Sequence, residues 1–218
     1  MEIEKQKKIR VYKKNIEVPT PTNEEVQKYL RHWDSLDNYR LQEDALNKLF
    51  FNVYPKNVEI EDILIKVAAL NDFYSTNIYY PFNMAQHILE LNIDDRMRVG
   101  DLSLVNDIAT LETKPGKVVN LYSFASKYCS HHYPEIYPIY DRYVEDILKH
   151  FRDNDSFYNF GNSDLKDYSK FKNIILNFQN HYEIRDYNIK FMDRYLWQVG
   201  KEYFPRSYKS SSKKIAED

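Results

Sequence analysis

Residues 137–144 read YPIYDRYV, and this stretch holds the clearest helix start in the chain. Pro138 is followed by the pair Tyr140-Asp141 and then by an apolar run. Aspartate is preferred at the position before a helix, where its carboxylate accepts hydrogen bonds from free backbone N–H groups. The pattern predicts a helix from Asp141 to about Phe151. Asp141 itself is either only a cap or a carboxylate held at the mouth of a cleft.

Working outward, helical patterns cover almost the whole chain. Apolar residues recur at helical spacing, and the scarcity of glycine, with 4 among 218 residues, disfavours sheets that need many tight turns. The sequence predicts an all-α fold of nine or ten helices with a loop at 152–163. The expected helices cover about 23–34, 39–52 and 59–74, a segment from Pro81 to about Leu91, a segment from Asp101 to about Leu111, a segment from near Lys117 through Cys129, and then 141–151, 164–180 and 187–203.

The composition is typical of one cytoplasmic domain. We expect a single helical domain of two lobes around a cleft at 20–205. It follows a charged extension at 1–19, with a short strand near 9–12, and precedes a disordered basic tail at 206–218. The single cysteine, Cys129, excludes an internal disulfide and fits a reducing compartment. The charged N-terminus predicts no signal peptide, and no apolar stretch is long enough to predict a membrane partner.

The net charge is −2, so no overall positive field marks the chain as a nucleic-acid binder. Basic residues do gather near both ends of the chain. Those clusters can contact phosphate groups, or they can be solvated tails, which is the commoner case.

Two neighbouring segments resemble a known family. LYSFASK at 121–127 and YPIYDRYV at 137–144 resemble the helix-hairpin-helix DNA glycosylases, most of all the 8-oxoguanine glycosylases of the archaeal second class. There a Gly-Tyr-Lys-x-Ala-Ser helix precedes an apolar-apolar-Asp-Arg-His helix start. Ala125 and Asp141 are sixteen residues apart, as the family alignment requires. The resemblance implies a two-lobed helical glycosylase-like fold in which Asp141 is the catalytic aspartate.

Two further stretches carry the resemblance. DRYLWQVGK at 193–201 is similar to the Asp-x-Tyr-x-Trp…Gly-Lys ending of the same class, and NDFYSTN at 71–77 lies where the family has a polar helix end. The resemblance implies that Asn77 fills the gap left by a flipped base. It also implies a base-binding pocket formed by Asp193, Trp197 and Lys201 together with Tyr122 and Ser123.

The chain departs from the family at two positions. The family hairpin is usually Leu-Pro-Gly-apolar-Gly, whereas this chain has Lys114-Pro115-Gly116-Lys117. We expect DNA phosphates to be bound there by a helix N-terminus and the two lysines, Lys114 and Lys117, beside Gly116, and by Arg142. The second departure is Ser123, which occupies the position of the catalytic lysine of bifunctional members. Because serine cannot form a Schiff base, the sequence predicts a monofunctional enzyme.

Lys127 is the second candidate catalytic residue. It follows Ser123 by one helical turn on the same face, and its side chain is expected to lean back toward Ser123. There it can bind phosphate, recognise the base or replace the missing lysine. The alternative is that Ser123, Lys127 and His131 form the solvent-exposed stripe of an amphipathic helix.

We expect no metal and no other cofactor. His131 and His132 are adjacent, so their side chains diverge on a helix, and no third ligand has suitable spacing. Cys129 lies on the apolar face and is expected to be a buried structural thiol.

The resemblance therefore implies a DNA glycosylase, expected to be a monomer, that flips a modified base out of double-stranded DNA. It hydrolyses the N-glycosidic bond and leaves an abasic site. Base-excision repair and defence against phage DNA with modified bases both fit that activity. The alternative is a non-catalytic module that binds nucleic acid or protein on the same fold, and a third possibility is a structural helical protein in which Asp141 is only a cap.

Overall fold

The computed structural model describes residues 17–205, and ten α-helices make up most of them, which confirms the all-α prediction. The predicted strand near 9–12 and the predicted tail at 206–218 lie outside the described residues. The helices are α1 (Asn23–Ser35), α2 (Asp37–Asn47), α3 (Ile60–Tyr74), α4 (Pro81–Glu90), α5 (Ile93–Arg98), α6 (Leu104–Ala109), α7 (Tyr122–His132), α8 (Arg142–Asp155), α9 (Tyr168–His181) and α10 (Ile189–Tyr203).

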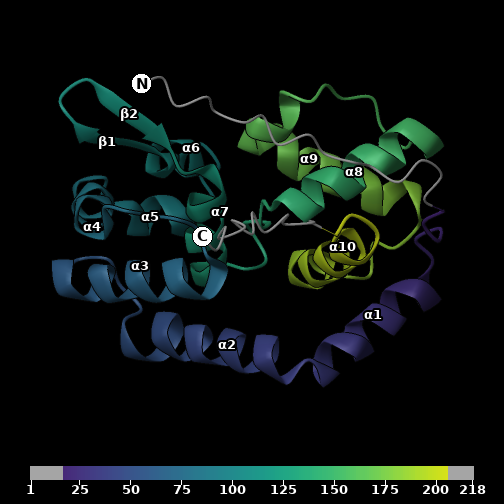
Figure 1. Cartoon of the computed structure of the whole chain (residues 1–218), viewed down its shortest axis with the longest axis horizontal. Helices are drawn as coiled ribbons and strands as arrows, with labels where there is room; N and C mark the ends of the chain where they lie inside the picture. Colours follow the sequence, from purple (N-terminus) through teal and green to yellow (C-terminus); the bar gives the residue numbers. More distant parts are fainter. Residues whose placement is uncertain (1–16, 206–218) are drawn as a thin grey trace, which may run out of the picture.

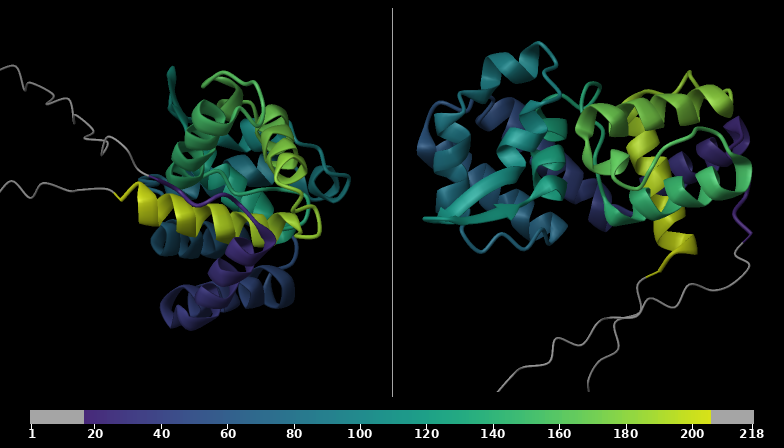
Figure 2. Two further views of the ribbon diagram at one scale, coloured as in Figure 1. Left: turned by 90° about the vertical axis from the view of Figure 1, so that its right-hand side faces the viewer. Right: turned by 90° about the horizontal axis from the view of Figure 1, so that it is seen from above.

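The helices form two groups (Figure 1). Helices α3 to α6 lie on one side, and α8, α9 and α10 lie on the other. Helices α1 and α2 run along one edge of both groups, with α1 packed on α10 and α2 packed on α3. The view from above in Figure 2 shows the same division. Helix α7 contacts α3 and α6, and the segment that follows it crosses to α8.

Helix starts agree closely with the sequence pattern. Thr22 caps α1 by accepting a hydrogen bond from the backbone N–H of Glu25 at 3.2 Å. Pro81 occupies the first turn of α4, where its missing N–H has no cost. Asp141 and Asp167 cap α8 and α9 through their carboxylates. The side-chain chemistry of Thr22, Pro81 and Asp141 was therefore sufficient to place three helix starts.

One prediction about the middle of the chain was wrong. The expected helix through Leu111 ends at Ala109, and an antiparallel hairpin follows, formed by β1 (Thr110–Lys114) and β2 (Lys117–Asn120). Leu111 faces the core from β1. Gly116 has φ of +75°, which suits the second central position of a turn after proline. The flanking threonines and valines are β-formers, and this signal was available in the sequence.

Three smaller differences complete the comparison. The short helix α5 was not predicted. The helix expected over 39–52 is α2 followed by a π-helical segment, Lys48–Val53. The helix expected from 164 begins as a 3₁₀ turn, Asp164–Lys166, before α9.

Helices α8 and α10 approach each other closely at one glycine. A Cβ atom built on Gly200 would lie 2.3 Å from the backbone oxygen of Tyr143, in the first turn of α8. The absence of a side chain at Gly200 thus lets α10 pack directly over the segment that follows Asp141.

Gly200→Ala is expected to lower the free energy of unfolding by about 2 kcal/mol. The added methyl group would meet backbone atoms and push the two helices apart, at a cost of about 3 kcal/mol, and alanine would recover about 1 kcal/mol in a helix interior. Urea denaturation of wild type and variant measures the difference. Gly161→Ala is the control, because a Cβ there would meet nothing closer than 3.5 Å. Equal stability of the Gly200→Ala variant and wild type would contradict this packing.

No helix within residues 17–205 is long and apolar enough to cross a membrane.

Candidate functional site

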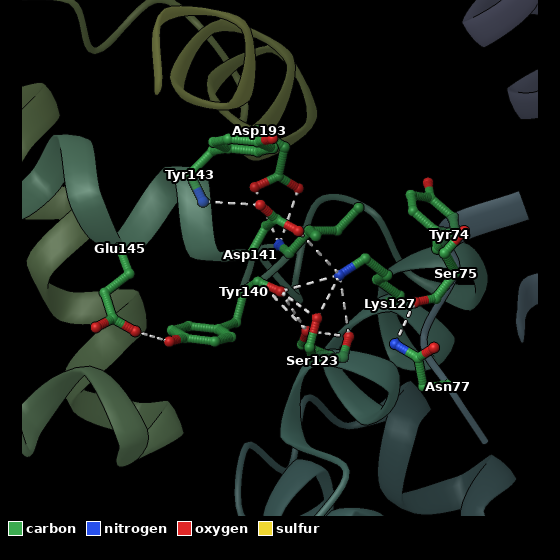
Figure 3. Close-up of polar contacts among 12 residues, drawn as sticks. Tyr74, Ser75, Asn77, Ser123, Lys127, Tyr140, Asp141, Tyr143, Glu145 and Asp193 are labelled. Atoms are coloured by element: carbon green, nitrogen blue, oxygen red, sulfur yellow. Dashed lines mark hydrogen bonds and ion pairs between the residues drawn. The ribbon is translucent and has the colours of Figure 1, made fainter. Parts of the chain in front are cut away.

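Asp141 is both a helix cap and one half of an ion pair. Its Oδ1 accepts a hydrogen bond from the backbone N–H of Tyr143 at 2.8 Å, which confirms the predicted cap of α8. Its Oδ2 lies 3.7 Å from Nζ of Lys127, and its side chain keeps 22% exposure (Figure 3). The two interpretations of Asp141 are therefore compatible, because one oxygen caps the helix while the other faces a cation.

Lys127 is buried, so the alternative of a solvent-exposed stripe is wrong. Its side chain is 3% exposed, and His131 one turn later is buried as well. Nζ of Lys127 lies back over the preceding turn, as predicted, and donates to Ser123 Oγ at 2.7 Å and to the carbonyl oxygen of Tyr140 at 3.1 Å. The ammonium group is thus held between α7 and the loop before Asp141.

The surroundings of Lys127 favour its neutral form more than water does. Burial lowers the pKa of Lys127, and the negative charges of Asp141 and Asp193 only partly oppose that shift. Nζ also lies 5.3 Å from the ring centroid of Tyr74, at the end of α3. A lysine with a lowered pKa beside a carboxylate is a combination typical of reactive sites, although structural ion pairs also produce it.

Three buried side chains fix the loop that carries Asp141. Ser126 Oγ accepts from the backbone N–H of Tyr140 at 3.0 Å, and Tyr168 donates to the carbonyl oxygen of Pro138 at 2.6 Å. Both carboxylate oxygens of Asp193 lie 3.0 Å from the backbone nitrogen of Ile139. The position of Asp141 is therefore set by contacts from α7, α9 and α10.

Asp193 was expected in a base-binding pocket, and the structure places it against the loop backbone instead. It is 5% exposed, and burial raises its pKa to about 8. Its neighbours limit that shift, because the positive charge of Lys190 and the N–H of Ile139 favour the charged carboxylate. Asp193 consequently positions Asp141 rather than facing an open pocket.

Asp193→Asn is expected to make stability less dependent on pH. The carboxyl pKa is about 8 when folded and roughly 3.9 when unfolded. Between these values the folded protein holds a proton that the unfolded chain releases, so this group makes the free energy of unfolding fall as pH rises from about 4 to about 8. Asparagine cannot titrate. Urea denaturation at about pH 5 and at about pH 7.5 measures this contribution. The excess of the pH 5 midpoint over the pH 7.5 midpoint should be smaller in the variant than in wild type. The same pH dependence in both proteins would refute the shift.

Trp197 and Lys201 follow Asp193 by about one and two turns of α10, and both belong to an aromatic cluster. Trp197 contacts the rings of Trp33 and Tyr39 at centroid distances of 5.9 and 5.0 Å, and Nζ of Lys201 lies 4.6 Å from the ring of Trp197. The cluster meets the Asp141 segment at Tyr143, whose ring centroid is 6.4 Å from that of Trp197. Trp197 thus packs between Tyr143 of α8 and the rings of α1 and α2.

The predicted phosphate contacts are only partly arranged as expected. Lys114, Gly116 and Lys117 form the turn of the β-hairpin, so the helix N-terminus expected there is not present. Two strands separated by a Pro-Gly turn replace the helical hairpin. Arg142 lies beside the site, but its guanidinium already pairs with Glu145 at 3.4 Å and Asp146 at 3.3 Å.

Asn77 is exposed near the Lys127 side of the site (Figure 3). It has a left-handed φ of 59°, and its amide donates to the carbonyl oxygen of Ser75 at 3.0 Å. Tyr74, which precedes this turn, donates or accepts a hydrogen bond with Nε2 of His131 at 3.0 Å. His131 and His132 are both buried, and residues 17–205 contain no group of three potential ligands placed to hold a metal ion.

Sequence reasoning missed a cavity next to the pair. Its volume is about 270 Å³, and its lining comes from Thr76, from the end of β2, from the first turn of α7, and from Tyr140 and Lys166. Tyr122 and Ser123, both expected in a base-binding pocket, lie in this lining. Ser123 connects the cavity to Lys127 through its hydroxyl group. Lys166 and Thr76 are far from α7 in the chain, and no sequence signal joins them.

Comparison with known proteins places the chain in a family. Residues 25–136 match the family model described as HI_0787_N, N-terminal domain. An uncharacterized protein of Haemophilus influenzae is 44% identical to the chain over 149 residues, which make up 68% of this chain and 71% of that protein. No solved structure matches the chain. The family match contains Lys127 and ends shortly before Asp141. The chain therefore belongs to the family of the HI_0787_N N-terminal domain.

Proposed function

We propose that this protein is a DNA glycosylase whose catalytic pair is Lys127 and Asp141. The observation that carries the proposal is the 3.7 Å approach of Lys127 Nζ to Asp141 Oδ2. A buried amine and a partly exposed carboxylate meet there, beside a cavity of about 270 Å³. The sequence resemblance supports the same assignment of Asp141. The substrate is double-stranded DNA with a modified base, and the protein acts as a cytoplasmic monomer in base-excision repair or phage defence.

Asp141 can stabilise the charge that develops during bond cleavage. When the C–N bond between sugar and base breaks, the sugar acquires oxocarbenium character, and a nearby carboxylate lowers the energy of that state. A water molecule then forms the new bond to the anomeric carbon and loses a proton, while the base leaves with the bonding electron pair and is protonated. The exposed part of Asp141 is the side available to the sugar.

Lys127 has two possible roles in this reaction. As an ammonium group it holds the Asp141 carboxylate and the Tyr140 carbonyl in place. As a neutral amine it can attack the anomeric carbon itself, since Nζ lies 2.7 Å from Ser123 Oγ, which stands where the glycosylases that the sequence resembles have their catalytic lysine. Hydrolysis remains our expectation. Treatment with borohydride during the reaction distinguishes the two roles, because only an imine with Lys127 would become a stable covalent adduct.

The proposal is tested with a panel of duplexes, each with one modified base. Incubation with the purified protein, followed by hot alkali or an abasic-site probe, is expected to cleave at least one duplex at the modified position. Unmodified duplex of the same sequence is the control. Failure to generate abasic sites in any duplex of a broad panel would contradict the proposal.

The burial of Lys127 favours a second candidate function. An ammonium group with three oxygen acceptors and an ion pair has all the partners that it needs to hold the loop structurally. In that case the chain is a non-catalytic module that binds nucleic acid or protein. This candidate predicts no abasic product, and it predicts that any DNA binding is the same after Asp141→Asn.

A further inference from the structure

Asn57 anchors the loop at 54–59, which leads from the π-helical segment to α3. Within that loop it is the only buried residue, so apolar packing contributes little to holding the loop in place. Its backbone N–H and its side-chain amide donate to the two carboxylate oxygens of Asp94 in α5, and its side-chain oxygen accepts from the hydroxyl group of Tyr128 in α7. The position of the 54–59 loop therefore depends on the polar contacts of Asn57.

Lys66 holds the same loop from α3. It is fully buried, and its Nζ donates to the carbonyl oxygens of Tyr54 at 3.0 Å and Lys56 at 2.8 Å and to Oδ1 of Asn57 at 2.7 Å. Burial lowers the pKa of Lys66 to about 8, so its amine is still protonated in neutral and acidic solution. A positive charge consequently lies beneath the loop.

His132, the last residue of α7, completes this network as a neutral acceptor. Its Nε2 lies 3.2 Å from the side-chain nitrogen of Asn57 and 3.5 Å from Nζ of Lys66. The orientation of the Asn57 amide is fixed by its other partners, because its oxygen accepts from Lys66 while its nitrogen donates to Asp94. Both neighbours of Nε2 are therefore donors, and Nε2 carries no hydrogen.

A proton on Nε2 of His132 would disrupt this arrangement. It would set a donor against two donors and place a second positive charge 3.5 Å from Lys66, away from water. Burial and the charge of Lys66 accordingly lower the pKa of His132 well below its usual value. Asp94 offers little relief, because Asn57 stands between its carboxylate and the ring. The other groups around the network are Asp62 from α3, Tyr128 and His131 from α7, and the ring of Phe50 from the π-helical segment.

We propose that His132 is a pH-sensitive latch for the 54–59 loop. In neutral solution the uncharged ring accepts from Asn57 and keeps the loop on α3 and α7. In mildly acidic solution the ring takes up a proton at Nε2, the hydrogen bond from Asn57 is lost, and the loop opens. Water then solvates the imidazolium, which the C-terminal end of α7 also favours. The latch does not depend on the proposed glycosylase activity.

Hydrogen exchange at the Asn57 amide measures the opening, because that N–H is bonded to Oδ2 of Asp94 at 2.9 Å. A solvated histidine titrates near pH 6.5, so uptake of one proton favours the open loop increasingly as the pH falls below that value. The protection factor of the Asn57 amide in the full chain should drop about twentyfold between about pH 7 and about pH 5. At both pH values it should stay below that of Leu196 in the middle of α10, because only the loop opens.

His132→Gln should remove this pH dependence. Glutamine offers an uncharged oxygen acceptor in place of Nε2 and cannot take up a proton. His131→Gln is the matched control, since His131 is also buried on α7 but its Nε2 faces the hydroxyl group of Tyr74 at 3.0 Å. The drop in protection at Asn57 should therefore persist in that variant. Circular dichroism verifies that each variant is folded.

Three results would overturn the latch. The first is a protection factor at Asn57 that changes by less than about twofold between the two pH values in wild type. The second is protection at Asn57 equal to that at Leu196, which would mean that the loop opens only when the whole chain unfolds; this comparison needs wild type alone and holds even where His132→Gln does not fold. The third is an undiminished drop in folded His132→Gln, or loss of the drop in His131→Gln.

Discussion

Asp141→Asn is expected to lower the rate of base excision by about 10²–10³-fold, the usual effect of removing a group that stabilises transition-state charge. Asparagine keeps the shape and the capping oxygen but has no negative charge to place beside the sugar. Asparagine is as good a helix cap as aspartate, but it leaves the buried ammonium group of Lys127 without its charged partner, so the free energy of unfolding should fall by about 1–3 kcal/mol. Single-turnover excision and urea denaturation measure the two quantities on the same preparation.

The control for this prediction is another aspartate whose carboxylate caps a helix. Asp167 caps α9 by accepting from the backbone N–H of Lys170 at 3.2 Å, and no ion pair joins it to Lys127. Asp167→Asn should therefore leave the excision rate within about twofold. Unchanged excision in the Asp141→Asn variant would mean that Asp141 is only a cap.

Lys127→Met is expected to lower the free energy of unfolding by about 2–4 kcal/mol. It leaves Asp141 unpaired and removes the donor to Ser123 and Tyr140 in a buried place. Methionine fills a similar volume, so the loss measures the polar contacts rather than a cavity. Excision should also fall to background, since either role of Lys127 needs its amine. Urea denaturation and the excision assay test the two effects.

Lys28→Met is the control for this second prediction. Lys28 pairs with Glu25 at 2.8 Å on the surface of α1 with a side chain that is 60% exposed, so its loss should cost no more than about 1 kcal/mol. A double-mutant cycle of Lys127→Met and Asp141→Asn should show a coupling free energy of about 0.5–3 kcal/mol. Strictly additive effects would show that the two side chains do not interact.

The sequence was informative wherever a local rule determines the structure. Thr22, Pro81 and Asp141 mark helix starts because caps and first turns have their own side-chain requirements. The backward lean of Lys127 toward Ser123 follows from helix geometry, and the structure confirms it. Burial of Lys127 was not predictable, because a lysine one turn after a serine is as typical of a solvent-exposed helix face as of a buried site.

The hairpin at 110–120 was missed although its signal is local, because Leu111 continued the apolar spacing of the preceding helix and the segment after Gly116 was assigned to the next one. Features that depend on distant segments could not be predicted. The position of Trp197 depends on which face of α10 meets α1, and its own sequence neighbours do not specify that. The cavity combines Thr76, Tyr122 and Lys166, which only the folded chain brings together.

The most direct test of a base-excising centre at Lys127 and Asp141 is a mass balance. Wild type and Asp141→Asn are incubated with the duplex that shows cleavage, and the free base and the abasic DNA are both quantified by mass spectrometry. A glycosylase predicts equal molar amounts of the two products with wild type and background amounts with Asp141→Asn. Intact DNA with wild type, or equal product with both proteins, would contradict the assignment.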